Sequence, residues 1–417
     1  MLDINYIRKN PDKVKEAAKN KNREVDIDKI LELDTKRIEH IQKSQKLREE
    51  RNAFSKGKPD EKTISRGKEI KSDLQKIEGE LRKIEEGLNN LLLYVPNVPL
   101  DEVPVGKDAT GNKELKKWGE LPKFNFKIKD HITLGMELDI FDLERGSKVS
   151  GFRGYFLKNE GAILQVALLF YVLQKLTNKG YTPFIAPSII KQFTLVGSGH
   201  FPWGSEQDVY KLNDDDMYLA GTAEIPITAY HAGEILQEND LPKRFVGFSP
   251  CFRKEAGAYG KDTKGLYRLH EFWKIEQVIL AKNDLDEARK IHEELENNAE
   301  EILQELKLPH RQLLMCTGDM GEPQLKKYDI ETWMPSRNAY GETMSNSIMG
   351  DFQARRLNIR YKTKEGKAEF VYTFNNTAVA SPRILIAILE NYQQEDGSVK
   401  IPNVLQKYTG FEEIKHK

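Results

Sequence analysis

The sequence predicts an α+β protein in which an antiparallel α-helical hairpin precedes a larger domain, built on a sheet whose strands need not be parallel. Three observations indicate this fold class. Residues 70–91 carry a heptad pattern of apolar side chains, residues 94–118 form a linker interrupted by proline and glycine, and residues 119–417 mix short β-rich runs with amphipathic helices. With 417 residues and 39% hydrophobic content, the chain is long enough for two or three structural units.

The apolar seam of the second hairpin helix gives the strongest periodic signal. Its members are spaced alternately by four and three residues, like the a and d positions of a coiled coil. They are Ile70, Leu74, Ile77, Leu81, Ile84, Leu88 and Leu91. Residues 27–56 form a second charged helical stretch, and the Gly and Pro between Lys56 and Asp60 predict the turn. The two helices therefore form a coiled-coil hairpin over about residues 27–94, with arms of roughly 45 Å at about 1.5 Å per residue.

Basic side chains gather around the predicted turn. They are Arg51, Lys56, Lys58, Lys62, Arg66, Lys68 and Lys71, against the acids Asp60, Glu61 and Glu69. Such a patch suits a phosphate backbone, so the hairpin is a candidate nucleic-acid contact. Periodicity alone favours a dimerisation or spacer element, and charge runs are usually solvated faces. Both interpretations stay open on the pattern itself.

The proline-punctuated linker marks a domain boundary. We place an N-terminal domain at residues 1–105 and a larger domain at residues 106–417. In the larger domain, β-rich runs occupy residues 244–248, 272–280 and 368–374, and amphipathic helices occupy residues 162–177 and 284–306.

Composition narrows the class of protein. Lysine plus arginine and aspartate plus glutamate both total 65, so any nucleic-acid contact must come from a local patch. Cys251 and Cys316 are too few for a disulfide framework or a four-cysteine zinc site, so we expect core thiols, a reducing compartment and no zinc. The N-terminus lacks the features of a signal or transit peptide, and no window reaches membrane-spanning length. We expect a cytoplasmic protein without membrane contact.

Several common catalytic patterns are absent from the sequence. It contains no GxxxxGK[ST] phosphate loop and no GxGxxG after a strand, so a bound nucleotide must be held mainly by side chains. His270-Glu271 lacks the second histidine of HExxH, and the eight histidines do not pair with the cysteines at metal-ligand spacing. We therefore expect a structural or hydrogen-bonding role for His270.

The segment from Cys251 to Glu276 carries the most informative pattern. It predicts a strand, a Gly-rich loop with several cations, and a returning strand on which Phe272 and Glu276 share a face because their separation is even. Arginines beside such a loop suit phosphate oxygens, and an aromatic ring on the same face suits a nucleobase. A charged surface hairpin explains the pattern about as well.

This segment, FRKEAGAYGKDTKGLYRLHEFWKIE, resembles motif two of class II aminoacyl-tRNA synthetases, and specifically of the seryl-tRNA synthetase family. The resemblance implies an antiparallel-sheet class II synthetase catalytic domain. It further implies that Arg253 binds the α-phosphate of ATP, that Glu255 meets the adenine amino group and that Phe272 stacks on the adenine ring.

The same resemblance implies that Arg268 contacts phosphate and that Glu276 binds the serine substrate. Lys261 and Lys264 stand where the family usually has arginine, which keeps the charge and loses bidentate geometry. We expect these two lysines to matter for the loop and not for the chemistry.

Residues 221–225, GTAEI, match the TAE loop of the same family. The match implies that Thr222 and Glu224 help to recognise serine, with Glu224 as a partner for its ammonium group. Residues 181–187, YTPFIAP, after the helix that begins at Ala162, resemble motif one, which builds the dimer interface of class II enzymes. A packing helix explains the motif-one segment equally well.

Residues 342–356 resemble the family segment in which an acid and a serine hold the magnesium ion bound to ATP. Glu342 and Ser345 stand at those positions, and hard oxygen ligands with substrate phosphates are what Mg²⁺ prefers. Met344 and Ile348 stand where the family usually has serine and asparagine, which leaves the hydroxyl and amide contacts of this segment open.

Residues 374–383, FNNTAVASPR, run into an apolar helix over residues 384–392 and resemble motif three. Arg383 would clamp the γ-phosphate of ATP, and Thr377 would supply a serine-binding hydroxyl. Pro382 fits the first turn of the helix that follows.

Together these resemblances imply a homodimeric ligase that uses ATP and Mg²⁺ to join L-serine to tRNA(Ser), with tRNA(Sec) as a second candidate acceptor. Arg253, Glu342 and Arg383 would carry catalysis by positioning and charge stabilisation, without a dedicated general base. In the family, the hairpin reaches across the dimer to the elbow and the long variable arm of the tRNA. Two alternatives remain: an RNA-binding relative that has lost the reaction, and a ligase for another amino acid or a carrier protein.

Overall fold

The computed structural model describes residues 1–54, 61–203, 208–213, 216–255 and 264–416, and the chain divides into two compact units, Met1–Val98 and Pro99–Lys417. The sequence analysis put the division after Val105. Residues 99–105 pack with the second unit: the Leu100 N–H donates to the Leu325 carbonyl at 3.0 Å, and Val103 lies in a buried cluster with Leu313.

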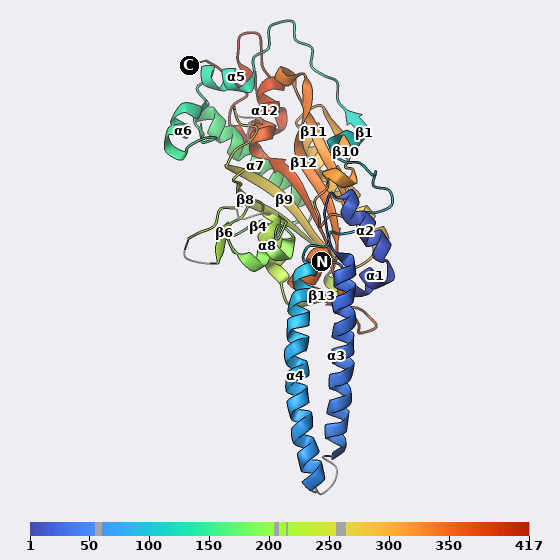
Figure 1. Cartoon of the computed structure of the whole chain (residues 1–417). Coiled ribbons are helices and arrows are strands. Elements are labelled where there is room, and N and C mark those ends of the chain that lie inside the picture. The colour runs from blue at the N-terminus through green and yellow to red at the C-terminus, as the bar shows by residue number, and fades with distance from the viewer. Residues whose placement is uncertain (55–60, 204–207, 214–215, 256–263, 417) are drawn as a thin grey trace. The chain divides into compact units, whose positions relative to one another are not determined.

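The described part of the N-terminal unit is helical. Its helices are α1 (Ile4–Lys9), α2 (Pro11–Asn20), α3 (Ile27–Phe54) and α4 (Glu61–Leu92). Helices α3 and α4 lie side by side as the two arms of a long hairpin (Figure 1). A buried cluster ties α1 and α2 to the ends of α3 and α4 that lie away from the tip, with members Ile7, Val14, Ile27, Ile30, Leu88 and Leu92.

The predicted seam is the packed face of α4. Ile70, Leu74 and Leu88 are buried, the other seam residues are half-buried, and residues 71–73 between two seam positions are exposed. Arg66, at the basic end of the hairpin, pairs with Glu50 of α3 at 2.8 Å, so this member of the basic patch helps to hold the arms together. The predicted turn from Lys56 to Asp60, including two of its lysines, lies outside the described residues.

The second unit is built on an eight-stranded sheet with the order β1-β10-β11-β12-β15-β9-β8-β4. All neighbours are antiparallel except β4 and β8, which run parallel. The strands are β1 (Lys113–Trp118), β4 (Thr182–Ile185), β8 (Lys243–Phe252), β9 (Glu271–Ala281), β10 (His310–Leu314), β11 (Lys326–Met334), β12 (Ala339–Gly350) and β15 (Tyr372–Ala380). The antiparallel α+β class expected from the sequence is confirmed.

Helices and short strands surround this sheet. The helices are α5 (His131–Glu137), α6 (Leu143–Ser150), α7 (Asn159–Asn178), α8 (Gln192–Ser198), α9 (Glu224–Thr228), α10 (Leu285–Glu305), α11 (Phe352–Leu357), α12 (Ser381–Asn391) and α13 (Asn403–Thr409). The remaining strands are β2 (Phe141–Asp142), β3 (Phe156–Leu157), β5 (Ile189–Lys191), β6 (Met217–Leu219), β7 (Ile235–Gln237), β13 (Arg360–Lys362), β14 (Ala368–Phe370), β16 (Val399–Lys400) and β17 (Glu413–Ile414).

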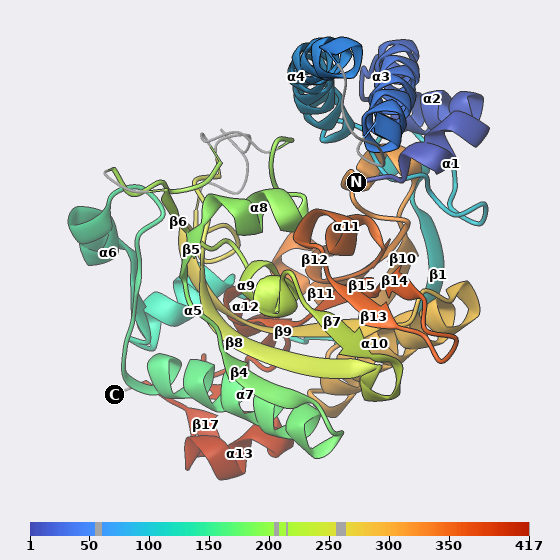
Figure 2. The same cartoon turned by 90° about the horizontal axis from the view of Figure 1, so that it is seen from below.

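The side chains of β9 point alternately to the two faces of the sheet, so the strand contributes to two separate hydrophobic clusters. Ile275 and Ile279 belong to the main core, which α7, α10 and α12 complete, whereas Val278 and Leu280 belong to a second cluster with residues of α9. Figure 2 shows α7 and α9 on opposite sides of β8 and β9. Because successive side chains of a strand point to opposite faces, the even-numbered residues of β9 lie on the face opposite Ile275 and Ile279.

The β-rich run at residues 368–374 is divided between two strands. The chain changes strand partners at the buried Val371. Strand β14 pairs with β13 in a small three-stranded sheet, and β15 pairs with β9 and β12 in the large one. The part after Gln393, to which the sequence assigned nothing, contributes Val399, Leu405 and Ile414 to the main core.

Candidate active site

A polar cavity of about 760 Å³, counting space open to solvent, lies at the even-numbered face of β9. The predicted site residues that line it are Arg253, Glu255, Arg268, Phe272, Glu342, Ser345, Thr377 and Arg383. Residues from three strands (β9, β12 and β15), from the segment between β8 and β9 and from the first turn of α12 therefore meet in one place.

The spacing of residues on β9 explains part of this convergence. Phe272 and Lys274 line the cavity, and Glu276 follows on the same face, buried behind Lys274. Glu276 is the cross-strand neighbour of Thr377 on β15, and the Thr377 hydroxyl donates to the Glu276 carboxylate at 3.0 Å.

Irregular strand pairing explains why residues of β12 and β15 reach the same cavity. Glu342 and Ser345 are three residues apart, which in a regular strand would turn their side chains to opposite faces. The pairing of β11 with β12 shifts between these positions, so that Thr343 is an extra residue on β12, and both side chains line the cavity. A similar shift at Ala378 on β15 brings Thr377 and Ala380 to the same cavity.

Cations and carboxylates of the cavity pair with each other. The Arg268 guanidinium donates to Glu255 at 2.5 Å, and Arg383 lies 3.3 Å from the Glu342 carboxylate. Arg253 lies over the Phe272 ring, 5.3 Å from its centroid. In this structure, two arginines expected to contact phosphate therefore pair with the carboxylates expected to contact adenine and magnesium. A third arginine, Arg253, covers the ring expected to stack on adenine.

Lys274 holds the serine-binding candidates together, and the sequence analysis gave it no role. Its ammonium group donates to the hydroxyls of Thr222 at 2.9 Å and Thr377 at 3.1 Å, and it pairs with the carboxylate of Glu276. Lys274 is almost fully buried. Its position on the strand between Phe272 and Glu276, two residues from each, was the signal that could have identified it.

Glu224 lies at the same end of the site and is buried. The side-chain amide of Gln353, from α11, donates to Glu224 at 2.8 Å, and the Glu224 N–H donates to the Thr222 hydroxyl at 3.2 Å. Burial raises the pKa of Glu224, although the Gln353 bond and the charge of Lys274 act against this rise. Gln353 is a second residue that the sequence analysis did not identify.

The pKa values of two carboxyl groups at this end of the cavity, Glu342 and Asp329, are shifted in opposite directions. Desolvation raises the pKa of Glu342, but the positive charges of Arg383 and Lys327 outweigh it and leave this pKa below its ordinary value. Asp329 is the cross-strand neighbour of Ser345. Burial and the charge of Glu342 raise the pKa of Asp329 to about 6, against the opposing effect of Lys327.

Several further expectations can be placed in the structure. Ile348, one of the two departures from the family pattern, is fully buried in the main core and does not line the cavity, while Met344 belongs to the core and also lines the cavity. The His270 Nδ1–H donates a hydrogen bond to the Arg253 carbonyl at 2.9 Å, in line with a hydrogen-bonding role. Cys251 and Cys316 are both buried free thiols. Lys261 lies outside the described residues.

In the ranges that the structure describes, no three or more His, Cys, Asp or Glu side chains are grouped so as to hold a metal ion. Within the same ranges, every helix is too short or too polar to cross a membrane.

Comparisons with known proteins agree with this geometry. A family model described as the tRNA synthetase class II core domain (G, H, P, S and T) matches residues 208–392, and one described as the seryl-tRNA synthetase N-terminal domain matches residues 1–99. The serine–tRNA ligase of Deinococcus radiodurans is 46% identical, over 99% of this chain and 99% of its own length.

Solved structures are similar over the full length. Seryl-tRNA synthetase from Pyrococcus horikoshii, complexed with ATP, is 40% identical and covers 100% of both chains with a TM-score of 0.94. The cytoplasmic serine–tRNA ligase of Naegleria fowleri, in complex with AMP, is 31% identical, covers 100% of this chain and 99% of its own, and has a TM-score of 0.90.

The sheet and its cavity therefore define the core of a class II aminoacyl-tRNA synthetase. A family model also matches the N-terminal helical unit, and the relatives match nearly the whole chain. The chain belongs to the seryl-tRNA synthetase family.

Proposed function

We propose that the cavity is where this chain, as an ATP-dependent serine–tRNA ligase of its family, forms seryl-adenylate from L-serine and ATP before transferring the seryl group to tRNA(Ser). One observation carries the assignment: Arg253, Arg268 and Arg383 line the same cavity as Lys274, which contacts a buried cluster of hydroxyls and a carboxylate. The first end suits a nucleoside triphosphate, and the second suits a small polar amino acid.

The reaction follows from these two ends. A carboxylate oxygen of serine attacks the α-phosphorus of ATP, and pyrophosphate leaves. A terminal ribose hydroxyl of the tRNA then attacks the acyl carbon, loses its proton, and AMP leaves. Both steps depend on positioning and on stabilising charge, for which Arg253, Arg383 and Glu342 are the catalytic candidates.

At the nucleotide end, Glu255 and Phe272 would contact adenine, and Arg253, Arg268 and Arg383 would bind phosphates once their internal pairs open. For Arg268 and Arg383, a phosphate would replace the carboxylates of Glu255 and Glu342 as the anionic partner. ATP binding therefore need not leave a buried cation unpaired.

At the amino-acid end, Thr222, Glu224, Glu276 and Thr377 would bind serine. The two carboxylates suit its ammonium group, and the hydroxyls suit its hydroxyl. A site built to hydrogen-bond a hydroxyl leaves buried polar groups unpaired when alanine enters, which favours serine over alanine. Threonine would be excluded by its additional methyl group.

Glu342 and Ser345 would hold Mg²⁺ together with ATP phosphates. Their fit rests on the shift in strand pairing at Thr343, which turns a carboxylate and a hydroxyl to the same cavity. Mg²⁺ commonly takes one or two protein oxygens and completes its shell with phosphate and water. When bound, the ion would supply positive charge to the phosphate oxygens.

The helical hairpin is the proposed tRNA contact. Arg51, Lys62, Lys68 and Lys71 are exposed on the parts of α3 and α4 nearest the tip. RNA helices are recognised largely through shape and backbone, which suits basic side chains on a rigid arm. The proposed acceptor is tRNA(Ser), with tRNA(Sec) as a second candidate.

A homodimer in the cytoplasm is the proposed state of the protein. Helix α7, from the motif-one segment, exposes Ile163, Val166 and Phe170, and they line an apolar groove with Tyr408. An exposed apolar stripe of this kind is typical of an interface. Light scattering on the purified chain tests this state, and a mass of one chain would contradict it.

Serine-dependent ATP–pyrophosphate exchange tests the proposed function. We expect exchange with serine in the presence of Mg²⁺, little exchange without Mg²⁺, and little with threonine, alanine or glycine. No exchange despite tight tRNA binding would instead indicate an RNA-binding relative without catalysis. Exchange with another amino acid would indicate a different ligase.

A further inference from the structure

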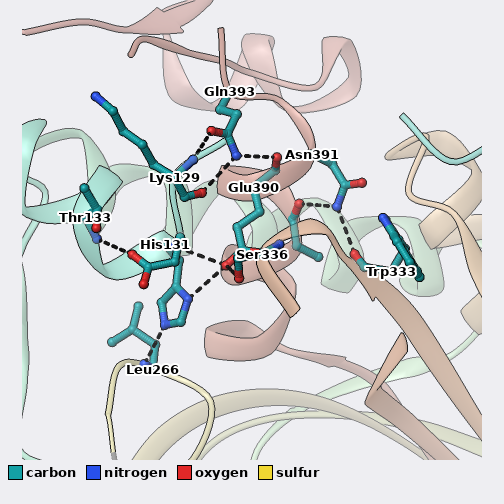
Figure 3. A network of polar contacts seen from close by, with 11 residues as sticks. Lys129, His131, Thr133, Leu266, Trp333, Ser336, Glu390, Asn391 and Gln393 are labelled. Atoms are coloured by element: carbon teal, nitrogen blue, oxygen red, sulfur yellow. Dashed lines mark hydrogen bonds and ion pairs between the residues drawn. The ribbon is translucent and has the colours of Figure 1, made fainter. Parts of the chain in front are cut away.

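His131 connects the wall of the nucleotide cavity to the helix that carries Arg383, although none of the motifs includes it. It is the first residue of α5 and is 6% exposed. Its side chain lies between Glu390, near the end of α12, and Leu266, which follows the undescribed residues of the motif-two segment (Figure 3).

The two ring nitrogens of His131 have different partners. Nδ1 lies 3.1 Å from a carboxylate oxygen of Glu390, and Nε2 accepts a hydrogen bond from the Leu266 N–H at 3.2 Å. A backbone N–H can only donate, so Nε2 must be unprotonated, and the ring proton lies on Nδ1, facing the carboxylate. A neutral ring in this single tautomer satisfies both contacts.

Glu390 fixes the orientation of the His131 ring. It is fully buried and also accepts hydrogen bonds from the backbone N–H of His131 at 3.0 Å and from the Ser336 N–H and hydroxyl at 3.0 and 2.8 Å. Burial raises the pKa of Glu390, but these hydrogen bonds together leave it below its ordinary value, so the carboxylate is charged. A charged acceptor with several donors holds the imidazole in one orientation.

The contact at Leu266 acts directly on the cavity wall. Leu266, Tyr267 and Arg268 all line the cavity, and the Tyr267 carbonyl accepts a hydrogen bond from Arg383 at 3.2 Å. The preceding residue, Gly265, has φ of +74°, and a Cβ there would lie 2.2 Å from His131 Nε2. The backbone thus approaches the imidazole so closely that only glycine fits.

We infer that His131 is a positioning residue for ATP binding: held by Glu390, its Nε2 fixes the backbone at Leu266 and thereby places Tyr267 and Arg268 against the nucleotide. The inference rests on the proposed function, since it gives that nucleotide site a support outside the three motifs. His131 itself touches no substrate.

Each of two substitutions removes one of the two contacts of the His131 ring and keeps the other. His131→Asn keeps a donor near the position of Nδ1 and loses the acceptor for the Leu266 N–H. His131→Gln keeps an acceptor near the position of Nε2 and loses the donor to Glu390. Gln393→Ala is the matched control, because Gln393 bonds to the backbone of Lys129 and of Glu390 in the same network without touching Leu266.

The readouts are ATP affinity by calorimetry and the KM values for ATP and serine in pyrophosphate exchange. We expect His131→Asn to weaken ATP binding and raise the ATP KM by about three- to tenfold, as for the loss of one buried hydrogen bond, with the serine KM changed less than about twofold. His131→Gln keeps an acceptor for the Leu266 N–H, so it should change the ATP values less than His131→Asn does, and Gln393→Ala should change them by less than about twofold.

Thermal unfolding of all variants separates this role from stability alone. Equal effects of His131→Asn and His131→Gln on ATP affinity, or effects that follow unfolding temperature across the three variants, would overturn the positioning role. ATP binding without serine-dependent exchange in the unsubstituted chain would overturn the proposed function, and the calorimetric values would still decide the role of His131. Failure of the unsubstituted chain to bind ATP would overturn both.

Discussion

Lys274 brings a buried cation to the end of the cavity where we propose that serine binds. Its ammonium group already pairs with Glu276 and donates to two hydroxyls. A serine ammonium group bound by Glu276 would therefore share this carboxylate with Lys274. A buried charge is costly without its partner. Removal of one member of the Lys274–Glu276 pair should therefore destabilise the protein more than removal of both members.

Substitution of this lysine tests the coupling. We expect Lys274→Met to lower the free energy of unfolding by about 3 kcal/mol, because Glu276 is left buried without its cation. The double variant Lys274→Met/Glu276→Gln should recover most of the loss. Urea unfolding of the single and double variants measures the coupling, and additive effects of the two substitutions would contradict it.

Glu296 provides a pH test at a single residue. It lies on α10 and is fully buried, and the side-chain amide of Asn346 donates to it at 2.9 Å. Burial raises its pKa to about 8. The native state therefore holds one more proton than the unfolded chain between about pH 4.3, the ordinary glutamate pKa, and about pH 8.

The sign of the effect follows from this raised pKa. The contribution of Glu296 to stability is complete below about pH 4.3 and is lost as the pH rises toward 8, by up to about 1.4 kcal/mol per pH unit. Glu296→Gln stays neutral, so its stability relative to the unsubstituted chain should improve steadily from pH 5 to pH 8. Urea unfolding at several pH values checks this, and a constant difference would refute it.

At the scale of elements, regular spacing was predictable and irregular pairing was not. The seam of α4 and the shared face of Phe272 and Glu276 follow from periods that are visible in the sequence. The extra residues at Thr343 and Ala378 arise from pairing with strands distant in sequence, and nothing local indicates them. The resemblance supplied Glu342, Ser345 and Thr377, and only the structure explains how their side chains reach one cavity.

The same limit applies to residues that act through tertiary contacts. Lys274 was visible on the strand between two assigned residues, yet its bonds to hydroxyls on two other elements appear only in the folded chain. His131 belongs to no quoted motif, and Gln353 lies in the segment of residues 342–356 without a predicted role. The contacts of His131 with Leu266 and of Gln353 with Glu224 each span more than one hundred residues. Such contacts cannot be inferred from one sequence without an alignment.

The hairpin can be tested as an element. Leu74 lies in the buried seam of α4, and its neighbour Gln75 is exposed. We expect Leu74→Ala to lower the stability of the arm by about 2 kcal/mol through lost packing, and Gln75→Ala to leave it within about 0.5 kcal/mol. Hydrogen exchange on α3 and α4 measures this local stability.

The same pair of variants separates the two proposed activities. If the arm contacts tRNA, Leu74→Ala should raise the tRNA KM in charging and leave serine-dependent exchange unchanged, while Gln75→Ala should change neither. A loss of exchange in Leu74→Ala would contradict this division of roles.

At the scale of the molecule, the sequence predicted two units because their patterns differ in kind: a heptad repeat before the linker and mixed α and β patterns after it. The exact position of the division depends on which unit the linker packs against. Leu100 and Val103 bind to the second unit by contacts with residues more than two hundred positions away, which no local pattern reveals.

We propose that one chain both activates serine and attaches it to tRNA(Ser). Charging of a tRNA(Ser) transcript with labelled serine by the purified chain, in the presence of ATP and Mg²⁺, measures both steps together. We expect acid-precipitable serine that depends on ATP and on the tRNA. Serine-dependent exchange without any charging of the tRNA would contradict it.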